Sequence, residues 1–139
     1  MYSNLCDDIH EYTEPSDLSV ADQAIAAEVL VKWYTYEGVL KCALEYSRVA
    51  SEQWRRSARD KQGVLPSAAL LELLEYWADG CGGQALSQAV AAEILAEIYW
   101  SVGQEQHNIE SYKEAASYWK KATEAWRGLY KAPIPVEQA

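Results

Sequence analysis

The sequence predicts an all-α protein of about five helices, folded as a single domain around a helical hairpin that occurs twice. Apolar residues recur at intervals of three and four, and no stretch alternates with the two-residue period of a strand. The prolines, and the glycines apart from Gly128, lie between or beyond these periodic stretches. A chain of 139 residues, 50% of them hydrophobic, can bury one core. We therefore expect one compact helical domain.

Two segment pairs carry the repeat. AAEVLVKWYTYEG at 26–38 resembles AAEILAEIYWSVG at 91–103, and ALEYSRVASEQWR at 43–55 resembles AASYWKKATEAWR at 115–127. Chance would give roughly one match in fifteen positions, far fewer than are found. The identical pairs are Ala26/Ala91, Ala27/Ala92, Glu28/Glu93, Leu30/Leu95, Tyr34/Tyr99, Gly38/Gly103, Ala43/Ala115, Tyr46/Tyr118, Ala50/Ala122, Glu52/Glu124, Trp54/Trp126 and Arg55/Arg127. The pattern indicates an internal duplication.

The predicted elements follow in order along the chain. An acidic arm at 1–16 precedes the helical domain at 17–130, and a tail at 131–139 follows it. Within the domain we expect helices at 17–36 and 39–61 (hairpin 1, 17–61), at 67–79 (a central helix), and at 84–102 and 110–130 (hairpin 2, 84–130).

The first hairpin is justified by its apolar stripe and its turn. Ala27, Leu30 and Tyr34 are spaced to share one face of a helix. Gly38 stands where this helix must end and the chain must turn, since glycine adopts positive φ at no steric cost. In the second helix, small and aromatic residues recur along one stripe, as in a close helix–helix seam: Ala43, Tyr46, Ala50 and Trp54.

The central helix and the second hairpin are bounded by similar signals. Pro66 begins the central helix and Gly80 ends it. Its leucines cover more than one face, so we expect it to lie between the two hairpins. In the second hairpin, Gly103 takes the place of Gly38, and the turn carries a seven-residue insertion, QEQHNIE. Ser111 and Glu114 are spaced as a capping box for the last helix.

At these residues the sequence resembles the tetratricopeptide repeat. The first copy keeps the family's intervals at Leu30, Tyr34, Gly38, Ala43 and Ala50, and the second gives Leu95, Tyr99, Gly103, Ala115 and Ala122 with only the turn interval longer. The family's Trp and Gly early in the first helix are Ala27 and Val31 here. A helical bundle grown by duplication is the alternative.

The resemblance implies a concave groove lined by the first helix of each unit. Its implied positions are Glu28, Lys32, Thr35 and Tyr36 in copy one and Glu93, Glu97, Trp100 and Ser101 in copy two; from these we take Glu28, Lys32, Tyr36, Glu93, Glu97 and Trp100 as candidate partner contacts. Such a groove would be acidic and aromatic. It would suit a basic or amphipathic segment of another protein.

Charge is distributed unevenly along the chain. Residues 1–31 contain no Lys or Arg, and the net charge of the chain is −9. This sign disfavours general nucleic-acid binding, which requires phosphate neutralisation. Arg55, Arg56 and Arg59 form the only local cluster that we consider for a phosphate contact.

Residues that could carry chemistry are sparse. Cys6 and His10 are one helical turn apart, but no third or fourth metal ligand is evident, and His107 lies in the inserted turn without a catalytic partner. We therefore predict no catalytic residues, no metal and no cofactor. The scattered Cys6, Cys42 and Cys81 favour reduced thiols. The lack of a membrane-length apolar run and of signal-peptide features predicts a cytoplasmic protein.

These expectations lead to a non-enzymatic adapter, chaperone or assembly factor that binds another protein through a helical groove or aromatic patch. One alternative is a small acidic inhibitor, of phage or mobile-element origin, that mimics nucleic acid and blocks a nucleic-acid-binding enzyme. A second is a helical subunit of a nucleoprotein assembly. Two hairpins and an unpaired helix would also leave an apolar flank through which the chain could form a homodimer.

Overall fold

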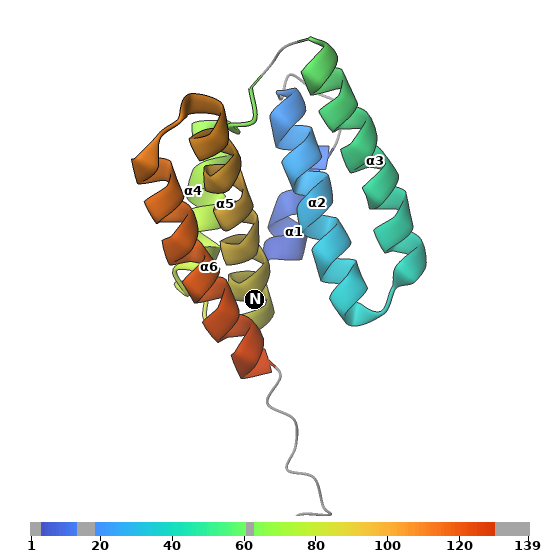
Figure 1. The fold of residues 1–139 in the computed structure, drawn as a ribbon. Coiled ribbons are helices and arrows are strands. Elements are labelled where there is room, and N and C mark those ends of the chain that lie inside the picture. The colour runs from blue at the N-terminus through green and yellow to red at the C-terminus, as the bar shows by residue number, and fades with distance from the viewer. Residues whose placement is uncertain (1–3, 14–18, 61–62, 130–139) are drawn as a thin grey trace, which may run out of the picture.

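The computed structural model describes residues 4–13, 19–60 and 63–129. All regular structure within these ranges is helical (Figure 1), which confirms the all-α class. The elements are α1 (Leu5–Ile9), the 3₁₀ helix η1 (His10–Thr13), α2 (Val20–Glu37), α3 (Leu40–Arg59), α4 (Ala68–Ala78), α5 (Ala85–Gln106) and α6 (Ile109–Leu129). The predicted arm boundary at residue 16 and the predicted tail at 131–139 lie outside the described residues.

Two antiparallel hairpins, α2–α3 and α5–α6, form the frame of the molecule. Figure 1 shows α2 and α5 as the inner pair, with α3 on the far side of α2. Helices α2 and α5 bury at least half of their residues, whereas α3 and α6 bury mainly small residues on one stripe. The inner helices therefore supply the core and the outer helices cover it.

The repeated aromatic residues make the same contact in each hairpin. Tyr34 and Tyr46 stack with ring centroids 6.0 Å apart and planes 8° apart. Tyr99 and Tyr118 stack at 5.9 Å and 7°. Alanines one turn away are buried and let the helices approach closely: Ala43, Ala50, Ala115 and Ala122. The sequence repeat is therefore also a structural repeat.

The two turns differ, although the sequence places a glycine at the same point in both. Gly38 ends α2 in the left-handed conformation, with φ of +80°, as predicted. Gly103 does not end its helix: α5 continues to Gln106, and His107 takes the left-handed position with φ of +50°. A Cβ at Gly103 would lie 3.0 Å from the Tyr112 ring, so this glycine serves close packing between α5 and α6. The predicted turn at Gly103 is wrong, because most of the seven-residue insertion extends the hairpin instead of lengthening its loop.

Two predicted helix starts also need correction. Ser67 caps α4 by accepting from the Leu70 N–H, so Pro66 precedes the helix rather than opening it. At the start of α6, Asn108 Oδ1 accepts from the Glu110 N–H at 2.9 Å. Ser111 is buried inside α6 and does not form the predicted capping box, because the helix already begins at Ile109, before Ser111.

The leucines of α4 predicted that this helix lies between the two hairpins, and this prediction is wrong. The helix packs against α5 and, to a lesser extent, α6, and Figure 1 shows it behind α5. One stripe of α4 is buried, comprising Leu70, Leu74, Trp77 and Ala78, while Leu71 and Leu73 are only partly buried. Its apolar residues thus extend the core of one hairpin without separating the two.

The N-terminal residues are part of the folded domain. Leu5 and Ile9 of α1 are fully buried against the core formed by the longer helices. The Leu5 N–H donates to Ser87 Oγ at 3.0 Å, and the Trp77 indole N–H donates to Asp8 Oδ2 at 3.0 Å. Residues 4–13 of the predicted acidic arm therefore join α4 and α5. Among the described helices, none has the length and apolarity needed to cross a membrane.

Candidate binding groove between the two hairpins

The inner helices α2 and α5 meet through a charged contact. Lys32 Nζ lies 3.1 Å from Glu93 Oε2 and 3.3 Å from Glu97 Oε2. Lys32 and Glu97 occupy equivalent positions of the two repeats, 65 residues apart in the alignment. The same position of the repeat thus carries opposite charges in the two copies, and these two residues pair with each other.

A second pair of equivalent residues holds the outer helices to the inner ones. The Trp54 indole N–H donates to Glu28 Oε2, and the Trp126 indole N–H donates to Glu93 Oε1 at 2.9 Å. Each bond runs from the outer helix of a hairpin to the inner helix of the same hairpin. Both glutamates are therefore held in place by an indole, but only Glu93 also receives the Lys32 ammonium.

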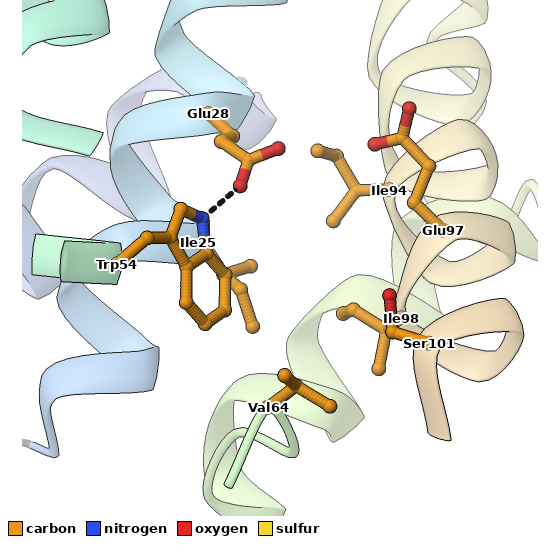
Figure 2. A pocket seen from close by; sticks show the side chains of 8 residues that line it. All are labelled: Ile25, Glu28, Trp54, Val64, Ile94, Glu97, Ile98 and Ser101. Carbon is orange, nitrogen blue, oxygen red and sulfur yellow. Dashed lines mark hydrogen bonds between the residues drawn. The ribbon is translucent and has the colours of Figure 1, made fainter. Parts of the chain in front are cut away.

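On one side of this charged contact lies a cavity of about 290 Å³, which we call the seam cavity. Its lining comprises Ile25, Glu28, Trp54, Val64, Ile94, Glu97, Ile98 and Ser101. Figure 2 shows the carboxylates of Glu28 and Glu97 on opposite walls, with isoleucine and valine side chains below them. The cavity is thus acidic toward one end, where the two carboxylates face each other, and apolar toward the other.

A second hollow, of about 300 Å³, lies on the other side of the Lys32 contact. It is lined by Val31, Lys32, Thr35, Tyr36, Glu93 and Trp126. The Tyr36 and Trp126 rings lie 5.7 Å apart and join the two hairpins across this hollow. We call the seam cavity, the Lys32 contact and this aromatic hollow together the groove.

The Lys32 ammonium contacts both Glu93 and Glu97, and these contacts shift the pKa values of Lys32 and Glu97. Burial lowers the pKa of Lys32, but Glu97 and Glu93 outweigh it and raise the pKa above its usual value. Burial raises the pKa of Glu97; Lys32 opposes the rise, while Glu28 and Glu93 add to it. The lysine is therefore firmly charged, and the groove retains a surplus of negative charge.

Five of the six residues predicted to contact a partner come together in this groove: Glu28, Lys32, Tyr36, Glu93 and Glu97. Trp100 does not join them. Its ring packs edge-on against Tyr112 of α6 at 5.0 Å, and the residue is 48% exposed outside both hollows of the groove.

Sequence reasoning missed the two tryptophans of the groove. Trp54 and Trp126 repeat on the apolar stripe of the second helix, a pattern that predicts a core position, whereas each also turns its indole N–H to a groove carboxylate. The usable signal was the joint repetition of Glu28 with Trp54 and of Glu93 with Trp126. Residues so paired in both copies are candidates for a shared contact.

The arginine cluster lies elsewhere. Arg55, Arg56 and Arg59 are exposed on α3, and none lines either hollow of the groove. Arg59 Nε lies 3.5 Å from Asp60 Oδ1, an exposed pair that contributes little. Their predicted phosphate contact stays a prediction.

Cys6, His10 and His107, the residues considered for metal binding or catalysis, lie in two separate parts of the structure. Cys6 Sγ and His10 Nε2 both approach the Tyr34 hydroxyl, at 3.8 and 3.2 Å. No cluster of three or more His, Cys, Asp or Glu suited to a metal ion occurs in the described ranges. His107 is an exposed residue at the end of α5.

Comparison with known proteins gives no relative for this arrangement. No protein-family model, curated protein or solved structure matches the chain.

Proposed function

We propose that the protein is a non-enzymatic interaction module, an adapter, chaperone or assembly factor, whose groove binds a basic or amphipathic segment of another protein. The observation that carries the proposal is the surplus of carboxylates between two hollows with apolar and aromatic linings. Apolar walls supply affinity and the charged centre supplies selectivity for a cationic partner.

The construction of the groove supports this role. Its walls come from α2 and α5, which are long helices with buried inner faces, so the carboxylates stand on a rigid frame. Tyr36 and Trp126 offer aromatic surface of the kind that anchors interfaces. We also propose that the hairpins are tetratricopeptide-like. In that interpretation the first helix of each unit lines the binding face, which agrees with a groove between α2 and α5.

A cation at the centre of the groove favours binding over mimicry of nucleic acid. An acidic inhibitor needs a continuous row of carboxylates where phosphates would lie, and Lys32 interrupts the row between Glu93 and Glu97. We also propose a cytoplasmic location, supported by cysteines that are all free: Cys6, Cys42 and Cys81.

Site-specific photo-crosslinking in the host cell tests the proposal. A photoreactive residue at Ser101 reports on the groove, and the same residue at exposed Ser117 of α6 is the matched control. We expect a partner adduct from position 101 that is absent from position 117, with the crosslink mapped to a basic segment. Equal adducts at both positions, or none at 101, would contradict the proposal.

The same experiment separates the alternatives. An adduct to a nucleic-acid-binding enzyme that added DNA displaces would favour the acidic inhibitor. An adduct to a second copy of this chain would indicate a homodimer through the groove.

A further inference from the structure

The seam cavity has the size of one side chain. At about 290 Å³ it falls at the lower limit of ligand sites, which span roughly 300–1,000 Å³. A peptide backbone with several side chains would not fit inside it. The cavity is therefore suited to a single group inserted from a segment that lies along the groove.

The negative charge at the seam cavity favours a cationic group. Glu28 and Glu97 project from α2 and α5 on opposite walls (Figure 2). The ammonium of Lys32 is engaged by Glu93 and Glu97 and does not line the cavity. Glu28 receives only the neutral indole N–H of Trp54 among the hydrogen bonds found for it. Two carboxylates, Glu93 and Glu97, thus share the one lysine, and the third, Glu28, faces the cavity with a neutral donor only.

The remaining walls suit a long aliphatic stem. Ile25, Ile94 and Ile98 are nearly fully buried and line the cavity below the carboxylates. Arginine and lysine side chains bury their methylene groups against apolar surface of this kind while the charged head reaches a polar group. Trp54, fixed by its bond to Glu28, adds an indole ring, the best aromatic partner for a cation.

We propose that the seam cavity binds the guanidinium of one arginine in the partner segment, an inference that rests on the proposed function. Arginine fits better than lysine because its planar fork presents N–H groups in several directions and can serve two separate carboxylates, while also stacking on an indole. Glu28 and Glu97 stand on opposite walls of the cavity, so a guanidinium between them faces a carboxylate on either side.

In the second repeat, the carboxylate equivalent to Glu28 is already engaged. Glu93, the counterpart of Glu28, already receives both Lys32 and Trp126. One arginine is therefore recognised per chain, and Trp54 and Trp126 become a matched pair of reporters. Arginine binding should perturb the first indole and leave the second unaffected.

The test uses the full chain labelled with ¹⁵N and follows the two indole N–H resonances by NMR. The probes are N-acetyl-arginine methylamide and its neutral isostere N-acetyl-citrulline methylamide. We expect a saturable shift of the Trp54 indole with arginine and affinity weaker by about tenfold or more for citrulline, which lacks the charge. Equal binding of both probes, or no shift of Trp54, would overturn the inference.

Isosteric variants test the carboxylates directly. Glu97→Gln and Glu28→Gln should each weaken arginine binding by about tenfold, since each removes a charge-assisted bond. Gln at position 28 can still accept from Trp54, so its fold should be preserved. Glu72→Gln, at an exposed site on α4, changes the net charge equally and should leave binding unchanged. Equal losses in all three variants would mean that only overall charge matters and would overturn the inference.

The inference and the proposed function can fail separately. A partner adduct at Ser101 together with an unperturbed Trp54 would overturn the arginine pocket and leave the interaction module standing. A Trp54 response without any adduct at Ser101 would overturn the assignment of the arginine to a partner protein.

Discussion

Replacing Lys32 with methionine removes the ammonium group from the centre of the groove and keeps an unbranched stem. The variant leaves Glu93 and Glu97 without their shared cation, with Glu28 nearby. Methionine can fill the same space because it is flexible and apolar. The Lys32→Met variant therefore isolates the electrostatic role of Lys32 in joining the two hairpins.

The expected cost follows from the exposure of the pair. Losing one partner of a fully buried pair costs roughly 3–5 kcal/mol, whereas an exposed pair contributes about 0–1 kcal/mol. The Lys32 and Glu93 side chains are 23% and 25% exposed, and Glu97 is 38% exposed and better screened by water. We expect a loss of about 2 kcal/mol in the free energy of unfolding. At about 4 °C per kcal/mol for a chain of this size, Tm falls by about 8 °C.

The pH dependence of this loss has a definite sign. The pKa of Glu97 is raised, so its protonation favours the folded state, and the penalty for its charge develops as pH rises above the ordinary value of 4.5. Removing Lys32 enlarges that penalty. The deficit of Lys32→Met should be largest near neutral pH and shrink toward pH 4.5. The pKa of Lys32 is also raised, so the lysine's own contribution persists to pH 10.5 and is lost only as pH rises further.

Chemical denaturation of wild type and variant across this pH range measures the effect. Lys113→Met is the control, because Lys113 pairs with Glu110 at a site where both side chains are at least 69% exposed. The control should lie within about 0.5 kcal/mol of wild type. A Lys32→Met variant as stable as the control, or a deficit independent of pH, would refute the reasoning.

Three further substitutions probe the packing by denaturation. Gly82→Ala should cost about 2 kcal/mol or more, because its Cβ would lie 2.0 Å from the ring of buried Trp77 and the ring must move; wild-type stability would show that the ring yields freely. Gly38→Ala should cost only about 1 kcal/mol, from the left-handed φ of +80° alone, since nothing lies within 4 Å; a cost as large as that of Gly82→Ala would mean that unseen contacts form there. Leu5→Ala should cost about 3 kcal/mol, because Leu5 is fully buried; a loss below about 1 kcal/mol would mean that α1 is not part of the core.

Much of the helical frame could be predicted from the sequence, because it depends on local signals. The spacing of Tyr34 and Tyr46 gave the first seam, and Gly38 gave the first turn. Gly103 misled because helix termination also depends on the neighbouring chain. There the missing Cβ makes room for Tyr112, and the helix continues.

Other features depend on tertiary contacts that no short pattern encodes. Helix α1 has only five residues, and its burial follows from long-range bonds such as that of Leu5 to Ser87. The groove carboxylates were predicted as a set, but the roles of Trp54 and Trp126 were not. A residue on the apolar stripe can pack its ring in the seam and still direct its N–H to a groove carboxylate.

The most direct test of the central claim is the affinity of the crosslinked partner for a groove that has been filled. Thr35→Trp and Ser101→Trp together occupy the two hollows, and Ser117→Trp on α6 is the control. Circular dichroism first verifies that the double variant is folded. We predict that it binds the partner at least tenfold more weakly than wild type, a loss of about 1.4 kcal/mol in binding free energy. The control should bind as wild type does. Unchanged affinity of the double variant would contradict the claim that the protein binds its partner through this groove.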